Sequence, residues 1–258
     1  MPVVRIDNYI DDYRLRAQSR DIHEMAGRPN KNASTDFVNQ QILAAIGLNQ
    51  FDVLVDVGCG DATLMKMVGG RVAECIGVAS TEEERASLES ASPNLRFIAS
   101  LAQELPLASN SASKIVCNAV LILFPSEEDV KAALREMARI ARPGATIWVG
   151  EVTDIDECEY YGMYRGHSMP AFLLHLLRHN GLRCFLGMIR RWLKAVTGSE
   201  QIVLNSARNF YAGPEKMISL ARDCGLQLKT YFRHKELDQQ GNVVESKFRY
   251  NYIFTPHR

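Results

Sequence analysis

The stretch Val55-Asp56-Val57-Gly58-Cys59-Gly60-Asp61-Ala62-Thr63 decides the fold. An apolar run leads into two closely spaced glycines, and a helical pattern follows. This is how the first strand of a doubly wound sheet turns into its first helix and forms a nucleotide-binding turn. Thr63 stands where the dinucleotide fingerprint Gly-x-Gly-x-x-Gly needs its third glycine, which argues against a dinucleotide. The turn instead carries Asp56, whose carboxylate suits a ligand with an ammonium group.

Outward from this turn, residues 51–150 alternate short β-branched runs with longer helical stretches. This alternation is typical of a parallel sheet covered by helices on both faces. Each predicted strand is short and mostly apolar, as a strand buried on both faces should be. We predict strands at 51–57, 74–79, 95–99, 114–120 and 145–152, and helices at 61–68, 81–91 and 127–141.

The segments on either side complete the predicted fold class, which is α/β. It is a Rossmann-like, doubly wound, mostly parallel sheet with an antiparallel C-terminal hairpin, plus a helical cap. Ser34 or Thr35 is expected to cap a helix that runs to Gly47, and Gly225 to stop a helix over 214–224. We predict a hairpin of strands 226–232 and 245–254, an N-terminal helical arm or lid at 1–33, a core at 34–153 and 213–258, and an inserted helical cap at 154–212.

The charge balance excludes several classes of partner. Thirty Lys and Arg face thirty Asp and Glu among 258 residues, so no net charge draws the chain to nucleic acid or to an anionic membrane. Six cysteines without a C-x-x-C pair indicate reduced thiols. The N-terminus lacks an apolar signal region, and residues 171–189 hold too many polar groups for a membrane span. We therefore expect a cytoplasmic protein with no transmembrane segment.

Three segments in order resemble the class I S-adenosylmethionine-dependent methyltransferases of the small-molecule type. Residues 55–63 resemble the family's Asp/Glu-x-Gly-x-Gly-x-Gly motif, with Ala62 in place of the last glycine. Residues 103–107, QELPL, resemble its acidic-Leu-Pro segment. Residues 134–144, LREMARIARPG, resemble its Leu-x-Glu-x-x-Arg-x-Leu-x-Pro-Gly segment. The resemblance covers residues 40–152 and implies this fold, methyl transfer and S-adenosyl-L-methionine as the cofactor.

The resemblance also implies a cofactor site, in which this sequence departs from the family at two positions. Ala79 stands where the family ends its second strand with an acid that binds both ribose hydroxyls. Leu101, ahead of Ala102, replaces a second acid that serves the adenine amine. The predicted cofactor-binding residues are Asp56, Gly58, Cys59, Gly60, Ala79, Ser80, Leu101, Ala102 and Asn118.

Other polar residues follow the predicted second strand. Ser80, Thr81 or Glu82 are candidates to reach the ribose in place of the missing acid. We interpret Glu83 and Glu84 as a solvated acidic first turn of the next helix, favoured by the helix dipole.

Candidates for acceptor chemistry lie in the predicted cap and just after the last parallel strand. His167 is the preferred general base, because the ordinary pKa of histidine lies near the working pH. Tyr164 and Asp154 complete the predicted catalytic set, although methyl transfer depends mainly on positioning. His175 and His179 stand four residues apart without a third ligand at a suitable spacing, so we predict no metal.

The predicted cap has an uneven charge. From Tyr160 to Ser199 there are six basic residues and no acidic one. This charge fits an anionic acceptor, such as a phosphorylated or nucleotide-linked sugar, or a peripheral contact with an acidic membrane. A basic helix face offset by acidic neighbours in the fold explains it equally well.

The sequence thus leads to two hypotheses. The first is an S-adenosylmethionine-dependent methyltransferase acting on a small molecule or glycan precursor, at oxygen. The second is a non-catalytic or chemically diverged methyltransferase-like protein that binds a ligand or partner, suggested by Ala79 and Leu101. We expect no nucleic-acid substrate, because residues 118–121, NAVL, stand where an Asn-Pro-Pro-Tyr type tetrapeptide would lie.

Overall fold

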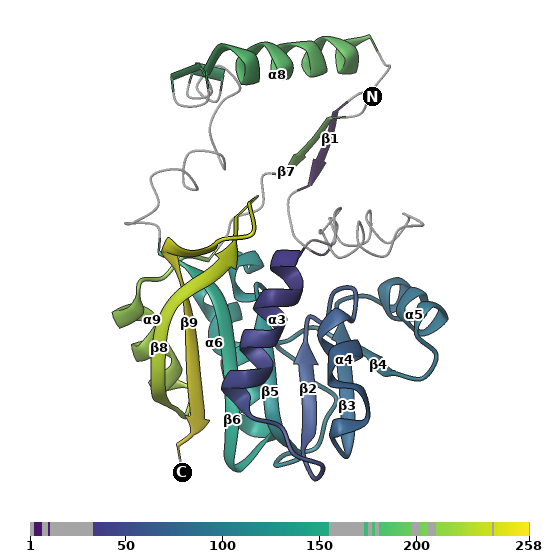
Figure 1. The fold of residues 1–258 in the computed structure, drawn as a ribbon, viewed down its shortest axis with the longest axis vertical. Coiled ribbons are helices and arrows are strands. Elements are labelled where there is room, and N and C mark those ends of the chain that lie inside the picture. The colour runs from purple at the N-terminus through teal and green to yellow at the C-terminus, as the bar shows by residue number, and fades with distance from the viewer. Residues whose placement is uncertain are drawn as a thin grey trace.

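The computed structural model describes residues 3–6, 10, 33–154, 173–174, 177–178, 181–197, 202–205, 210–238 and 240–257. Within them, a seven-stranded sheet has the order β4-β3-β2-β5-β6-β9-β8 (Figure 1). Strands β2 to β6 are parallel, and β9 runs antiparallel to both of its neighbours, β6 and β8. The predicted fold class, a doubly wound sheet that ends in an antiparallel hairpin, is confirmed.

The parallel part of the sheet reverses its direction of growth between β2 and β5. From β2 the chain builds outward to β3 and β4, and it then returns to place β5 and β6 on the other side. The carboxyl ends of β2 and β5 therefore flank the switch point at which such sheets bind ligands. The elements are β2 Val53–Val57, α4 Thr63–Val68, β3 Glu74–Ala79, α5 Glu82–Ala91, β4 Arg96–Ala99, β5 Ala112–Asn118, α6 Glu127–Ile140 and β6 Ala141–Thr153.

The C-terminal hairpin closes the sheet next to β6. Helix α9, Pro214–Asp223, leads into strands β8, Leu226–Leu237, and β9, Val243–Pro256. Gly225 has a φ of +81° and ends the helix as predicted. Both strands are longer than predicted, because the ladder continues to the turn, where the Asp238 carboxylate accepts hydrogen bonds from the backbone of Gln240 and Asn242.

Helix α3, Ala33–Ile46, covers one face of the sheet and differs from the prediction at its start. The helix already includes Ser34, so the predicted capping by Ser34 or Thr35 is wrong. The Ser34 hydroxyl instead accepts a hydrogen bond of 3.0 Å from the backbone N–H of Leu237 in β8. The start of α3 is therefore fixed by a tertiary contact that local capping rules do not contain.

Apolar side chains fill both faces of the sheet. On one face, Ile42 of α3 and Leu64 of α4 pack with Leu54 and Trp148 of the strands. On the other face, α6 and α9 cover a larger cluster that includes Met137. Burial on both sides explains why the parallel strands read as continuous apolar runs.

A short pair of strands lies outside the main sheet. Strand β1, Val3–Ile6, pairs in parallel with β7, Ile202–Asn205, and α8, Gly181–Val196, lies beyond this pair in Figure 1. The predicted arm is therefore a strand, not a helix, at residues 3–6, and the predicted helical cap contains a strand at β7. Both strands are rich in β-branched residues, which favour strands. Each strand needs the other as its pairing partner, and the two are far apart in the sequence. Among the described residues, no helix is long and apolar enough to cross a membrane.

The packing of Met137 gives a first prediction. Its side chain is fully buried, so Met137→Ala should lower the free energy of unfolding by about 2–5 kcal/mol through lost burial and a cavity. Urea denaturation measures this change. Arg135→Ala, at an exposed position of the same helix, is the matched control and should change stability by less than about 0.5 kcal/mol. Equal effects of the two variants would contradict the assigned packing.

Candidate functional site

The turn after β2 is built around the missing side chain of Gly58. Its φ of +75° favours glycine, and a Cβ there would lie 2.4 Å from Cγ2 of Val120 in the segment after β5. The backbone N–H groups of Gly58 and Cys59 both donate to the carbonyl of Val78, at 3.0 and 3.1 Å. The turn is thus anchored to β3 while its backbone passes close to the chain that leaves β5.

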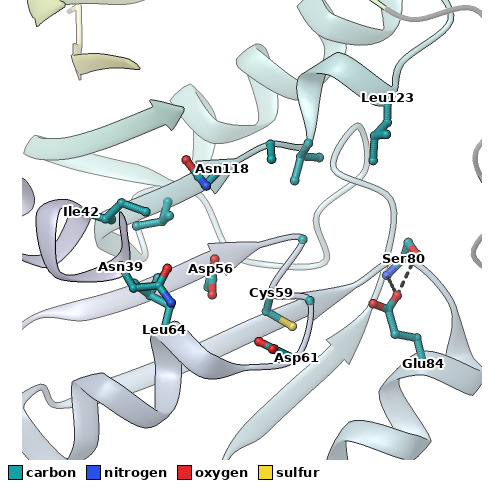
Figure 2. A pocket seen from close by; sticks show the side chains of 15 residues that line it. Asn39, Ile42, Asp56, Cys59, Asp61, Leu64, Ser80, Glu84, Asn118 and Leu123 are labelled. Atoms are coloured by element: carbon teal, nitrogen blue, oxygen red, sulfur yellow. Dashed lines mark hydrogen bonds between the residues drawn. The ribbon is translucent and has the colours of Figure 1, made fainter. Parts of the chain in front are cut away.

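A pocket with a cavity volume of about 120 Å³, partly open to solvent, lies over this turn at the carboxyl ends of β2, β3 and β5 (Figure 2). The structure brings together six of the predicted cofactor residues in its lining: Asp56, Gly58, Cys59, Gly60, Ser80 and Asn118. The sequence reasoning did not single out the other lining residues, Asn39, Ile42, Asp61, Leu64, Glu84, Val116, Ala119, Val120 and Leu123, as cofactor contacts.

The remaining predicted residues lie elsewhere. Ala79 is fully buried in β3 opposite Ala99, and neither Leu101 nor Ala102 lines the pocket. Asp154 is buried after β6, where its backbone N–H donates to the Phe248 carbonyl at 2.7 Å. The predicted catalytic residues Tyr164 and His167 lie outside the described residues, as do His175 and His179.

Glu84 is the main correction to the sequence interpretation. It was expected to be solvated, but its side chain is 4% exposed and lines the pocket. The carboxylate oxygen Oε2 accepts hydrogen bonds of 2.8 Å from both the backbone N–H and the hydroxyl of Ser80 (Figure 2). Burial raises the pKa of Glu84 above its usual value. One sequence signal was available, because Glu84 precedes the buried Leu88 by four residues and so shares its helix face.

The negative charge at the opposite end of the pocket belongs to Asp56. It sits on β2 and is 5% exposed, and Figure 2 shows it near Asn39 and away from Glu84. Burial, reinforced by the charge of Asp56, holds the pKa of the Cys59 thiol well above its usual value. Cys59 therefore contributes a neutral, weakly polar wall and not a thiolate. In the part of the chain that the structure describes, no cluster of His, Cys, Asp and Glu is arranged to hold a metal ion.

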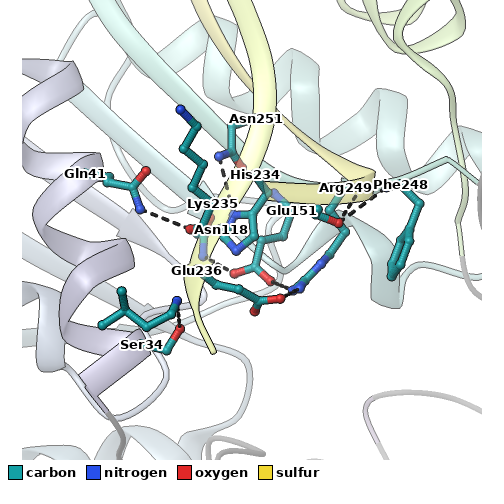
Figure 3. Close-up of polar contacts among 12 residues, drawn as sticks. Ser34, Gln41, Asn118, Glu151, His234, Lys235, Glu236, Phe248, Arg249 and Asn251 are labelled. Carbon is teal, nitrogen blue, oxygen red and sulfur yellow. Dashed lines mark hydrogen bonds and ion pairs between the residues drawn. The ribbon is translucent and has the colours of Figure 1, made fainter. Parts of the chain in front are cut away.

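Asn118, at the end of β5, is held by two partners. Its amide Nδ2 donates to Oε1 of Glu151 at 2.9 Å (Figure 3). Its Oδ1 accepts from Nε1 of Trp148 at 3.1 Å. Gly150 leaves the space for this arrangement, since a Cβ there would lie 2.0 Å from Oδ1 of Asn118. The amide orientation is consequently fixed on the pocket wall.

Glu151 connects this wall to the C-terminal hairpin. Its Oε2 accepts from Nη1 of Arg249 at 2.9 Å, and Arg249 also pairs with Glu236. The backbone N–H of Glu151 donates to Oδ1 of Asn251 at 3.0 Å. Glu151 has a φ of +58°, a strained value for a residue with a side chain, and these contacts stabilise it there.

The same hairpin buries His234. The oxygen of Asn251 already accepts from Glu151, so its amide nitrogen faces Nδ1 of His234 at 3.4 Å and a neutral imidazole accepts that hydrogen bond. Burial lowers the pKa of His234 below its usual 6.5.

The buried imidazole predicts a pH dependence of stability. Above about pH 6.5 it is neutral in the folded and unfolded states, whereas below that pH only the unfolded state readily takes up the proton. The free energy of unfolding should therefore fall on going from about pH 7.5 to about pH 5.5, by up to about 1.4 kcal/mol for each unit of lowered pKa. Urea denaturation at both pH values should show a smaller fall for His234→Gln. His257→Gln, at an exposed site, is the control and should keep the full fall.

Comparisons with known proteins agree with this architecture. Residues 55–149 match a family model described as a methyltransferase domain. A complex of the Haloferax volcanii Trm112 methyltransferase activator with a methyltransferase contains a similar chain, at 12% identity and a TM-score of 0.63, with coverage of 98% of this chain and 100% of that one. N-methyltransferase NodS from Bradyrhizobium japonicum, solved with S-adenosylhomocysteine, matches at 12% identity and 0.60, covering 98% and 100%. The [4+2]-cyclase SpnF matches at 13% and 0.58, covering 98% of each chain.

A search of curated protein sequences finds no match. Residues 55–149 are nevertheless similar to a methyltransferase domain, and the chain shares the fold of solved S-adenosylmethionine-dependent methyltransferases. The family model covers residues 55–149, from the end of β2 before the Gly58 turn into the last parallel strand, β6.

Proposed function

We propose that this chain is a class I S-adenosylmethionine-dependent methyltransferase that acts on a small molecule or a glycan precursor and transfers the methyl group to an oxygen atom. The observation that carries the cofactor part of the proposal is the pocket itself, which has backbone exposed at Gly58 and a buried carboxylate towards each end. When bound, the cofactor supplies a methyl group on a positively charged sulfur. The chain's own residues bind it, orient it and exclude water.

The two carboxylates suit opposite ends of the cofactor. Asp56, beside the glycine turn, is the acceptor for the ammonium group of the methionine part. Glu84 lies at the end of the pocket next to Ser80, just past the strand on which the family places its ribose-binding acid. In this chain Ala79 occupies that position, and we assign the ribose hydroxyls to Glu84 instead.

The contacts of Glu84 support this assignment. The Glu84 carboxylate accepts hydrogen bonds from Ser80 and from the backbone of Thr81. A carboxylate has about four acceptor positions, so capacity is left for ligand hydroxyls. The Thr81 hydroxyl accepts from the Glu84 N–H at 3.2 Å and caps α5, which fixes the backbone from which the side chain extends. The carboxylate is thus buried, oriented and only partly satisfied, as a binding group should be.

The assignment predicts the affinity of S-adenosylhomocysteine. Glu84→Gln replaces the carboxylate that accepts hydrogen bonds from the ribose hydroxyls with a neutral amide. It should weaken binding of S-adenosylhomocysteine about 10- to 100-fold in titration calorimetry. Glu83→Gln, at the exposed neighbouring position, should bind as the unchanged protein does.

An analogue of S-adenosylhomocysteine without the two ribose hydroxyls separates ribose binding from general electrostatics. The analogue should bind the unchanged protein and the Glu84→Gln variant with nearly equal affinity. Affinity of the unchanged protein for S-adenosylhomocysteine should also fall as the pH decreases, because the hydroxyls bind the ionised form of a carboxylate whose pKa is raised. An undiminished affinity in Glu84→Gln would show that another group holds the ribose.

On the acceptor side, the pocket wall of Asn118, Ala119, Val120 and Leu123 follows β5, the strand next to the glycine turn. This wall faces the place where an acceptor meets the methyl group in our proposal. Asp154, Tyr164 and His167 remain the proposed catalytic set, with His167 as the base for a hydroxyl. The basic segment 160–199 supports an anionic acceptor.

The activity itself is tested with isotope-labelled cofactor and a panel of phosphorylated and nucleotide-linked sugars. We expect label in the product on an oxygen atom. Asn118→Ala should lower kcat/KM by at least about 10-fold, because the fixed amide is lost from the wall. His167→Ala should lower kcat and change its pH profile. Transfer to nitrogen, or to no member of the panel, would contradict the proposed acceptor class.

A second candidate is a chemically diverged protein that keeps the fold and binds a ligand. The missing acids at Ala79 and Leu101 favour it, and a [4+2]-cyclase with the same fold is a precedent for changed chemistry. Binding of S-adenosylhomocysteine without consumption of cofactor in the presence of any acceptor would favour this candidate.

A further inference from the structure

Helix α8 exposes a row of leucines. Leu182, Leu186 and Leu193 are 60%, 53% and 51% exposed. They follow one another at steps of four and seven residues, so they share one narrow strip of the helix. Scattered single apolar residues are normal on a protein surface, but a continuous strip of them marks an interaction site. Two further exposed leucines, Leu174 and Leu177, precede the helix.

A basic row borders this strip. Arg183, Arg190 and Lys194 are exposed and lie about 80° further round the helix than the leucines. No acidic residue occurs from residue 160 to residue 199, although the whole chain has equal numbers of basic and acidic residues. The positive charge is therefore concentrated on the part of the molecule that also exposes the leucines.

We propose that α8 docks the protein on the surface of an anionic lipid bilayer. An apolar strip bordered by basic residues is the pattern of helices that lie in the plane of a membrane interface. The leucines would enter the acyl boundary while the basic row meets acidic headgroups. A symmetric contact between two copies of this surface would bring two uniformly basic rows together, and charge repulsion opposes that arrangement.

The position of α8 agrees with this role. Figure 1 shows the helix beyond the β1–β7 pair and at the end of the molecule toward which β2 points. The pocket opens at the same end of the strands. A docked protein would therefore turn its pocket toward the bilayer, and an acceptor carried by a lipid would be within reach. This last consequence rests on the proposed methyl transfer, whereas docking itself does not.

Co-sedimentation of the full chain with vesicles tests the proposal. We expect binding to vesicles of phosphatidylcholine mixed with phosphatidylglycerol, at least about 10-fold stronger than to phosphatidylcholine alone, and weaker binding in high salt. The double variant Leu186→Asp with Leu193→Asp should lose at least about 10-fold of the partition. Phe51→Asp, at a 75% exposed apolar residue between α3 and β2, is the matched control and should bind like the unchanged protein.

The basic row has its own test. Arg183→Gln with Arg190→Gln should weaken binding to the anionic vesicles, whereas Lys229→Gln, at an exposed position of β8, should not. All variants change exposed residues, so unaltered thermal unfolding and unaltered titration with S-adenosylhomocysteine confirm that the fold and pocket are intact. The titration also separates the docking proposal from the proposed methyl transfer, because docking can fail while cofactor binding remains.

Three results would overturn the docking proposal. The first is absence of binding to the anionic vesicles, or equal binding to both kinds of vesicle. The second is unchanged binding of the leucine variant. The third is a dimer of the unchanged protein in solution that the leucine variant converts to a monomer, which would assign the strip to a contact between copies of this chain.

Discussion

The close approach of Gly58 to Val120 is the constraint on which the pocket depends. Parallel strands β2 and β5 lie side by side, and the chain leaves them in different directions at the same edge of the sheet. Space for a ligand exists there because position 58 has no Cβ, since any side chain would collide with Cγ2 of Val120. The backbone itself then forms part of the pocket surface, and its N–H groups are held by Val78.

Backbone strain is concentrated around this pocket. Ala62, Ala119 and Glu151 adopt left-handed conformations with φ near +58°, at a cost of about 1–2 kcal/mol each for residues with a Cβ. Ala62 occupies the position at which the family motif has its last glycine, so the conformation is kept although the residue has changed. Each strained residue is held by a hydrogen bond of its own N–H: Ala62 to Cys59, Ala119 to Gly150, and Glu151 to Asn251. Such strain persists where the surroundings impose it, which is characteristic of functional sites.

The sequence predicted the sheet well because its strands are buried on both faces and are separated by capped helices. It predicted the glycine turn because the spacing of Gly58 and Gly60 is a local feature. Glu84 was misjudged for a physical reason: three consecutive glutamates resemble a solvated first turn, and the N-terminal end of a helix favours negative charge whichever way a side chain points. Only the packing of Leu88 on the same face distinguishes Glu84 from its neighbours. The contact of Ser34 with Leu237 spans some 200 residues and has no local signature either.

The position of Glu84 also changes how the pocket is coupled to the fold. An acid at the end of β3 would be held by the sheet, whereas Glu84 belongs to the first turn of α5 and is bound to Ser80 in the preceding loop. The Thr81 cap and the Ser80 contacts must form together for the carboxylate to face the pocket. A ligand that hydrogen-bonds the Glu84 carboxylate therefore stabilises the start of α5 as well as its own binding site. At the other end, Asn118 depends in the same way on Glu151 and the hairpin. The two ends of the pocket are thus supported by separate parts of the chain, and a substitution in one support should leave binding at the other end largely intact.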